Sequence, residues 1–258
     1  MSFVNYNKKG KIAYIMLDRS EYNPINFEMV AELDAVWEDF DSDNELWVAI
    51  LGSSQKNFST GFDIKAFRKL LEEEGFSWKN SSLFGDKRLG PDGHSVTKPI
   101  IGAFDGIVNA ASMWLFFQSD IRIATPKTIF GLPEGKLNIL VEFAGLMNRY
   151  APRAIINEML FTGNNVNAQR FYELGILNRI VDQPQLIPEA TKIAENICKL
   201  GPVSVRAMKK LVRCGYEMEH DELMALSAGM IVPIVNAQET KEGMDAFLEK
   251  RKPVWKIK

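Results

Sequence analysis

Apolar residues recur with two different periods in the first half of the chain, which predicts that strands and helices alternate there. Residues 11–17 (KIAYIML) alternate and are rich in β-forming side chains, so they predict a strand. In residues 26–41 the apolar side chains recur at helical spacing and would bury one face of a helix. Residues 46–51 (LWVAIL) form a short apolar run that ends at a glycine, which predicts a buried strand.

The pattern then becomes more polar. Residues 63–74 are highly charged and predict a surface helix. Residues 75–93 hold many glycine, serine and asparagine residues with scattered aromatics, and predict a mobile loop or lid. This stretch shows no sustained period of either kind.

The second half of the chain is mostly helical in pattern. Further predicted elements are strands at 99–104, 120–124 and 179–182, helices at 110–117 and from 142 onward, and a last helix at 236–251. Alternating elements followed by helices indicate an α/β core with a C-terminal helical subdomain. We place the core at residues 1–195 and the helical region at 196–258.

Composition and charge argue against several classes of function. The chain has 258 residues and a formal net charge of -2, so nothing suggests nucleic-acid binding. No signal-peptide run and no apolar stretch of about 18 residues is present, so we expect no membrane span. We expect Cys198 and Cys214 to be free thiols in a reducing, cytoplasmic setting. His94 and His220 are far apart, which argues against a histidine-based metal site or triad.

Two loops could present backbone amides to a ligand. In residues 58–63 (FSTGFD), a glycine turn after a buried strand lets the backbone approach a ligand and turns the Phe62 amide outward. In residues 105–114 (DGIVNAASMW), small side chains before a helix leave the amides accessible. Such loops are often ordinary tight turns. If they converge, they form an oxyanion hole, which stabilises an enolate by several kcal/mol.

Two glutamates are candidate acids or bases. Glu134 lies just past a predicted strand and a proline, in residues 129–134 (IFGLPE). Glu142 follows eight residues later. Each has an ordinary alternative, because a lone glutamate at a turn is usually a surface residue, and one in a first helical turn is favoured by the helix dipole.

These pieces, in this order, resemble the crotonase (enoyl-CoA hydratase/isomerase) superfamily over nearly the whole chain. The segments that carry the resemblance, besides the two loops and Glu134, are residues 23–26 (NPIN), 98–101 (KPII), Gly106, 119–122 (SDIR) and 242–253 (EGMDAFLEKRKP). The resemblance implies an α/β fold, a crotonase-type spiral of ββα units, with a C-terminal helical region that forms homotrimers or hexamers. It also implies an acyl-CoA thioester substrate from fatty acid metabolism, and coenzyme A only as part of that substrate.

The resemblance also assigns roles to individual residues. The backbone amides of Phe62 and Ala111 match the oxyanion hole. The strip that lines the adenine pocket matches Asp63, Ile64, Lys65 and Phe67. Phe247 and Lys250 match tail residues that reach the nucleotide, often from a neighbouring subunit, although a surface lysine is an equally good interpretation of Lys250.

The sequence departs from the family at the catalytic acids. Typical hydratases hold water with two glutamates; Glu134 matches the second, but the first falls on Trp114, which cannot transfer a proton. Trp114 would instead shape the acyl pocket or simply fill the core. The family's Pro-Gly-x-Gly-Gly turn is replaced by residues 141–145 (VEFAG), where some members carry an acid that matches Glu142.

Three hypotheses follow from this departure. The first is an isomerase, in which Glu134 alone moves a proton from C2 to C4 of an enoyl-CoA. The second is a non-standard hydratase or acyl-CoA hydrolase that uses Glu134 together with Glu142. The third is a homologue that has lost catalysis and only binds acyl-CoA or a protein.

Overall fold

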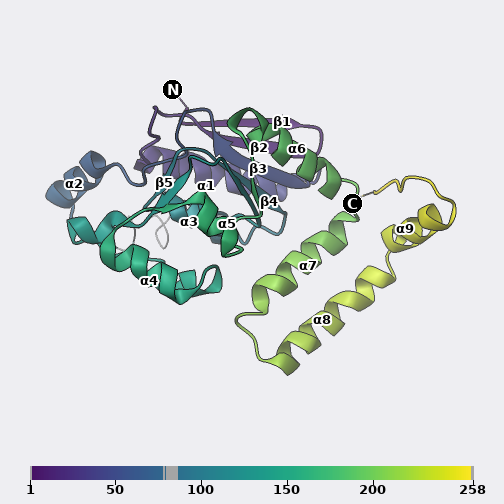
Figure 1. Ribbon diagram of the computed structural model, residues 1–258. Coiled ribbons are helices and arrows are strands. Elements are labelled where there is room, and N and C mark those ends of the chain that lie inside the picture. The colour runs from purple at the N-terminus through teal and green to yellow at the C-terminus, as the bar shows by residue number, and fades with distance from the viewer. Residues whose placement is uncertain (1, 78, 80–86, 257–258) are drawn as a thin grey trace.

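Two β-sheets form the centre of the molecule, and C-terminal helices extend away from them (Figure 1). The computed structural model describes residues 2–77, 79 and 87–256. The larger sheet has the order β1–β2–β3–β4–β6–β9; β1 and β2 are antiparallel, and the later neighbours are parallel. Its strands are β1 (Val4–Lys9), β2 (Ile12–Leu17), β3 (Val48–Ser53), β4 (Ile100–Phe104), β6 (Ile121–Ala124) and β9 (Arg179–Ile180).

Both faces of this sheet are covered. Along β3, Ala49 and Leu51 join the core cluster that contains α1, whereas Val48 and Ile50 join the cluster that contains α6. This alternation is the period of two that a strand imposes on its side chains. Burial on both faces explains why the predicted strands appear as continuous apolar runs.

The smaller sheet aligns three loop ends. Its order is β5–β7–β8, and its strands are β5 (Ile107–Asn109), β7 (Ile129–Gly131) and β8 (Val166–Asn167). Ser59, after β3, bridges in parallel to Val108 of β5, and β5 runs parallel to β7. The chain segments that follow Ser59, Asn109 and Gly131 therefore leave the sheet on the same side.

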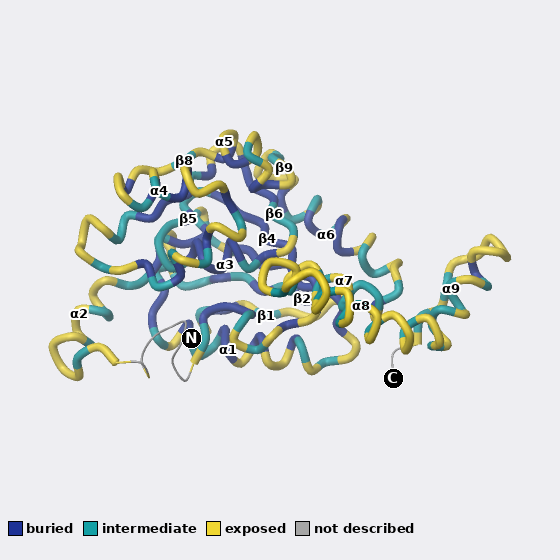
Figure 2. Tube along the Cα trace, turned by 90° about the horizontal axis from the view of Figure 1, so that it is seen from below, coloured by how far each residue is buried: buried dark blue, intermediate teal, exposed yellow. Residues whose placement is uncertain are grey.

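Helices surround the two sheets. In the core they are α1 (Phe27–Ser42), α2 (Ile64–Glu73), α3 (Ser112–Gln118), α4 (Arg153–Thr162), α5 (Ala168–Glu173) and α6 (Leu186–Ile197). Short 3₁₀ helices are η2 (Pro91–His94), η3 (Pro133–Leu137), η4 (Ala144–Arg149) and η5 (Gln183–Gln185). The Asn26 side chain caps α1 by accepting from the Met29 amide at 3.0 Å. Figure 2 shows that the buried residues gather around the sheets.

The last three helices form an arm beside the core. They are α7 (Pro202–Cys214), α8 (His220–Val235) and α9 (Gln238–Leu248). Lys209 ties α7 to the core, because its Nζ donates to the Lys98 carbonyl and contacts the Asp120 carboxylate, each at 2.8 Å. Figure 2 shows the arm mostly exposed. Within the described ranges, no helix has both the length and the apolar character needed to cross a bilayer.

Most predicted elements are present, with corrections. The strands β1, β5 and β8 were not predicted, and the helix expected from Ala110 begins only at Ser112, because Ala110 has a left-handed φ of +54°. The stretch from residue 142 is not α-helical at first; it holds η4, and α4 begins at Arg153. Of the predicted lid, residues 78 and 80–86 lie outside the described residues.

Candidate active site

The loop after β3 is fixed by backbone hydrogen bonds on both sides. The Ser59 amide donates to the Ile107 carbonyl at 2.9 Å, and the Asn109 amide donates to the Ser59 carbonyl at 3.0 Å. On the other side, Ile25 accepts from the Asp63 amide at 2.7 Å and donates to the Gly61 carbonyl at 2.8 Å. The Phe62 amide between these anchors is thus held in one place.

Gly61 brings this loop against the turn before α3. Its φ is +89°, a conformation that side chains rarely adopt. A Cβ at this position would lie 2.5 Å from the Ala110 Cβ and 3.2 Å from the Ala111 nitrogen. The turns that carry the Phe62 and Ala111 amides are therefore in direct contact, as predicted for an oxyanion hole.

The two amides are available to a ligand. Among the described residues, neither the Phe62 nor the Ala111 N–H has a hydrogen-bond acceptor. Nearby polar groups are used otherwise: the Ser112 hydroxyl donates to the carbonyls of Ser59 at 3.0 Å and Asn109 at 2.7 Å. Two fixed donors of this kind suit an oxygen atom that gains negative charge.

Glu134 reaches the same region through the end of β7. The Ala110 amide donates to the Gly131 carbonyl at 2.9 Å, and η3 begins two residues after Gly131 with Glu134 in its first turn. The side chain is half-buried, yet its Oε2 is shielded from solvent and has no hydrogen-bond partner in the described structure. An unpaired carboxylate oxygen is costly to bury unless it has a functional partner.

Burial also changes the acidity of Glu134. It raises the pKa of the carboxyl to about 7, and a hydrogen bond from its own amide offsets this only in part. A carboxyl that titrates near neutral pH is well matched to taking up and releasing protons. The sequence located this residue, but its unpaired oxygen and raised pKa are visible only in the structure.

Trp114 is a buried aromatic on α3. It stands one turn after Ala111 on α3, where its amide donates to the Ala111 carbonyl at 3.1 Å. Its ring packs on Phe143 with 5.1 Å between centroids, and its indole N–H donates to Asp92 Oδ1 at 3.0 Å. Glu142, next to Phe143, is half-buried in the turn before η4 and not in a helix, so a helix dipole does not explain its place.

The strip predicted to bind coenzyme A begins α2 and adjoins the loop. Asp63 caps the helix and pairs with Arg19 at 2.8 Å; burial alone would raise its pKa, but the Arg19 hydrogen bond and those from α2 amides outweigh it and lower the pKa. Ile64 and Lys65 are exposed on the first turn. Phe67 packs on Phe62, with 6.1 Å between ring centroids.

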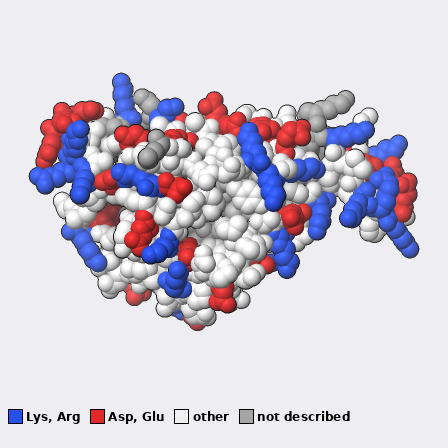
Figure 3. Space-filling view, turned by 90° about the horizontal axis from the view of Figure 1, so that it is seen from above, with Lys and Arg blue, Asp and Glu red and all other residues white. Residues whose placement is uncertain are grey.

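The two predicted tail residues lie far from this strip within one chain. Phe247 is 82% exposed on α9, and Lys250 follows it with a left-handed φ of +55°. Figures 1 and 2 place α2 and α9 at opposite ends of the molecule, and Figure 3 shows charged side chains gathered at both ends. The structure of one chain does not bring these two groups together.

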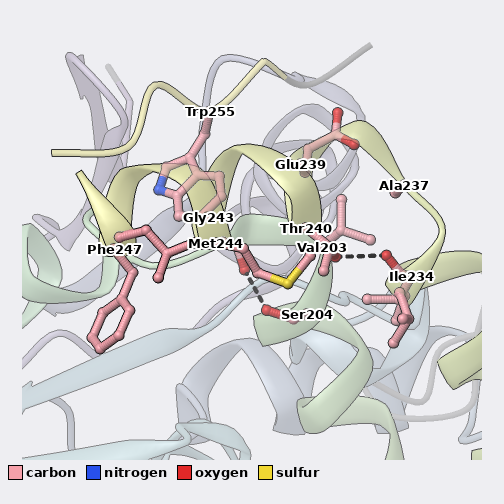
Figure 4. A pocket seen from close by; sticks show the side chains of 13 residues that line it. Val203, Ser204, Ile234, Ala237, Glu239, Thr240, Gly243, Met244, Phe247 and Trp255 are labelled. Carbon is pink, nitrogen blue, oxygen red and sulfur yellow. Dashed lines mark hydrogen bonds between the residues drawn. The ribbon is translucent and has the colours of Figure 1, made fainter. Parts of the chain in front are cut away.

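Phe247 borders an apolar groove in the arm. The groove measures about 590 Å³ and lies between α7, α8, α9 and Trp255 (Figure 4). Trp255 covers Gly243, where a Cβ would lie 3.1 Å from its ring. The groove therefore lies wholly within the arm, between its own helices and Trp255.

The sequence missed Asp92. It lies between a proline and a glycine in η2, a pattern typical of a loop, and its partner Trp114 is 22 residues away. No local sequence pattern predicts a contact between residues so far apart in the chain.

Among the described residues, no group of three or more histidine, cysteine or acidic side chains could hold a metal ion.

Comparisons with known proteins agree on one family. The family model for enoyl-CoA hydratase/isomerase matches residues 7–258. The chain is 32% identical to a protein named carnitinyl-CoA dehydratase from Citrobacter koseri and 31% identical to one from Escherichia coli K12, and each match covers 98% of both proteins.

Solved structures extend this similarity to the fold. An enoyl-CoA hydratase from Mycobacterium tuberculosis superimposes with a TM-score of 0.89 at 29% identity, over 99% of each chain. An enoyl-CoA hydratase/isomerase from Mycobacterium paratuberculosis gives a TM-score of 0.90 at 25% identity, over 100% of this chain and 99% of that one. The α/β fold expected from the sequence resemblance is confirmed.

Proposed function

Since the chain belongs to the enoyl-CoA hydratase/isomerase family of the crotonase superfamily, we propose that it moves a proton at C2 of an acyl-CoA thioester through Glu134. The family makes the chain an enzyme of lyase or isomerase type whose substrate is a CoA thioester. The observation that carries the proposal is the Glu134 carboxyl, whose Oε2 is buried and has no hydrogen-bond partner among the described residues. It follows the end of β7, where the Gly131 carbonyl accepts from the Ala110 amide.

In the favoured reaction, Glu134 shifts a double bond. The substrate thioester oxygen accepts hydrogen bonds from the Phe62 and Ala111 amides, which makes the C2 proton more acidic. Glu134 removes that proton from a 3-enoyl-CoA, and the negative charge moves to the thioester oxygen. The carboxyl then returns the proton at C4, which leaves the 2-enoyl-CoA and the starting carboxylate.

A second candidate is the removal or addition of water. It is favoured by the relatives, which are named as carnitinyl-CoA dehydratases and are about one-third identical over nearly their whole length. Isomerisation and the removal of water both begin with loss of the C2 proton, and the addition of water ends with its return, so Glu134 and the two amides serve either reaction. They differ in whether a second group acts on the acyl chain.

Coenzyme A would lie along the start of α2, and the tail would come from a neighbouring chain. The exposed first turn with Ile64 and Lys65 adjoins the loop that holds the Phe62 amide. Phe247 and Lys250 lie at the other end of the molecule, so an assembly of chains is needed to bring them to a nucleotide (Figure 1). We therefore keep the homotrimer, or a hexamer of two trimers, as part of the proposal.

The test is incubation of the pure protein with 3-hexenoyl-CoA, followed by absorbance and mass. A conjugated product of unchanged mass is expected, and Glu134→Ala should lower turnover by about 1,000-fold with little change in ligand affinity. Glu142→Ala is the matched control: it should cost less than about tenfold, or 1.4 kcal/mol. Normal turnover by Glu134→Ala would contradict the proposal, and a large loss in Glu142→Ala would favour the paired-glutamate hypothesis.

A further inference from the structure

The two turns that carry the oxyanion amides, residues 59–62 and 109–111, come from different strand ends. The backbone ladder between them ends where the Asn109 amide donates to the Ser59 carbonyl at 3.0 Å. The Phe62 amide lies three residues beyond Ser59 in one turn, and the Ala111 amide lies two residues beyond Asn109 in the other. Gly61 brings the turns into contact, but its own amide donates to Ser59 Oγ at 3.0 Å, within its own turn. The separation of the two amides is therefore sensitive to any further contact between the turns.

The Ser112 side chain provides such a contact. Its hydroxyl donates to the Ser59 carbonyl at 3.0 Å and to the Asn109 carbonyl at 2.7 Å. A hydroxyl carries one proton, so the two carbonyls share it. One carbonyl belongs to the turn of Phe62 and the other to the turn of Ala111. Within the described residues, no other side chain forms hydrogen bonds to both turns.

Ser112 makes this contact instead of capping a helix. It is the first residue of α3, and Ala111 before it provides no side-chain cap. A serine at a helix start often accepts from an amide of the first turn, whereas this hydroxyl donates backward to two carbonyls. Ser112 and Ser59 are both fully buried. Solvent therefore does not replace the bond between them if the hydroxyl is removed.

The turn that Ser112 contacts is itself fixed. The Ser59 hydroxyl donates to the Asn23 carbonyl at 2.7 Å and accepts from the Gly61 amide at 3.0 Å. Other amides of the same loop also have acceptors, which leaves that of Phe62 unused: Thr60 donates to Tyr22, and Asp63 donates to Ile25. Because Ser59 is held in this way, its bond to Ser112 fixes the start of α3, and with it the Ala111 amide, relative to Phe62.

We propose that Ser112 is a positioning residue of the oxyanion hole, whose hydroxyl sets the separation of the Phe62 and Ala111 amides. The inference rests on the proposed function, because it requires these amides to bind the thioester oxygen. Negative charge on that oxygen grows as the C2 proton leaves, so the hydrogen bonds are stronger to the enolate than to the bound substrate. Misplaced donors therefore lower the rate more than they lower the affinity.

Exchange of the C2 hydrogens of butyryl-CoA in D₂O measures formation of the enolate by the full-length protein. Ser112→Ala removes the hydroxyl and keeps the rest of the side chain. We expect the exchange rate at saturation to fall by about tenfold, and the half-saturating concentration to change by less than about threefold. Ser112→Cys keeps a weaker donor, so its rate should fall by only about threefold. It also carries the test if Ser112→Ala does not fold.

Ser119→Ala is the matched control at the other end of the same helix. Ser119 follows α3 and is 2% exposed, and its hydroxyl donates to the Leu115 carbonyl at 2.9 Å. Both alanine variants should lose a similar amount of stability in thermal unfolding, because each loses one buried hydrogen-bond donor. Ser119→Ala should nevertheless keep the exchange rate of the wild-type protein. Equal loss of exchange in the two variants would show a general structural effect and overturn the inference.

The infrared carbonyl band of bound butyryl-CoA, labelled with carbon-13 at the thioester carbonyl, reports on the hole without any proton transfer. Hydrogen bonds from two amides weaken the carbonyl bond, so the band of the wild-type complex should lie at lower frequency than that of the free thioester. Ser112→Ala should lose a large part of this shift, and Ser119→Ala should retain it. Because the band does not depend on a base, it can also be measured in Glu134→Ala.

The outcomes separate the inference from the function on which it rests. Slower exchange together with a smaller band shift in Ser112→Ala supports the inference. In a protein that exchanges C2 hydrogens, either readout unchanged in Ser112→Ala overturns the inference and leaves the proposed function standing. A wild-type protein that shifts the band without exchange contradicts the proposed role of Glu134, and the band alone then decides the role of Ser112. A wild-type complex with no band shift contradicts the assigned hole, and both proposals fail.

Discussion

The core and the arm shift the pKa of a carboxyl group in opposite directions. In the core, burial raises the pKa of Glu134 to about 7, and its Oε2 has no partner in the described structure. In the arm, hydrogen bonds from Arg251 and the Val254 amide lower the pKa of Glu242 to about 2. In the core, the Glu134 carboxyl has a raised pKa that suits proton transfer. In the arm, the hydrogen bonds of Glu242 stabilise the C-terminal end of the chain.

The same two regions also differ in their apolar side chains. Most of those in the core are buried, and Trp37, Phe40 and Phe116 are fully inside. In the arm, α8 has no buried residue, and the described apolar side chains that lie in the open include Ile231, Met244 and Phe247. An exposed apolar surface of this kind marks a contact with another molecule. This difference supports the proposed assembly, in which a neighbouring chain would cover the arm.

The largest of these effects should come from Gly61, where the turns that carry the two amides meet. Gly61→Ala adds a Cβ that would meet the Ala110 Cβ at 2.5 Å, so the two turns must separate and the amides lose their alignment. We expect kcat to fall by about 100-fold or more, as for loss of an oxyanion donor. Gly10→Ala is the matched control, since Gly10 has a similar left-handed φ of +56° but open space around it. Equal activities of the two variants would contradict the assigned hole.

The acidity of Glu134 gives the next effect. The carboxyl must be ionised to take a proton, and its pKa of about 7 means that it is mostly protonated at lower pH. The ratio kcat/KM should therefore rise with pH up to about 7 and fall about tenfold for each unit below it. A carboxylate with the low pKa of Glu242, about 2, would instead keep kcat/KM constant down to about pH 3. A profile that is flat between pH 5 and 8 would exclude Glu134 as the base.

The arm should show a smaller effect that depends on assembly. Phe247→Asp puts a charge on the exposed face of α9, so we expect the proposed trimer to dissociate and KM for acyl-CoA to rise by about tenfold. Phe161→Asp is the matched control, because Phe161 on α4 of the core is 81% exposed and Phe247 is 82% exposed. Light scattering and steady-state kinetics measure both variants. If only Phe161→Asp dissociates the assembly, the subunit interface lies on the core and not on the arm.

The sequence predicted the fold wherever the apolar period was strong. The buried strands β3 and β4 and the helix α1 were found within about two residues, which is the usual uncertainty of element ends. The strand β1 was missed because it lies at the sheet edge, where its polar residues, such as Asn7 and Lys8, are exposed. Ala110 was missed as a helix breaker because its left-handed backbone is imposed by neighbours rather than by its side chain.

Local sequence patterns predicted only those parts of the site that directly follow a strand or a turn. Glu134 and the two amides follow strands, and the aligned strand ends bring them together. The contact between Trp114 and Asp92 joins elements that α1 positions, and no spacing rule encodes it. Phe247 was matched to a nucleotide-binding role, but α9, which carries it, lies at the opposite end of the molecule from α2.

The separation of α2 and α9 has a genetic consequence. In an assembly of three such chains, each site would combine the core of one chain with the tail of another. One allele could carry a defect at Glu134 and a second allele a defect at Phe247, and the product of each alone would be impaired. Expressed together, they would restore some sites, because an intact core of one product would meet an intact tail of the other.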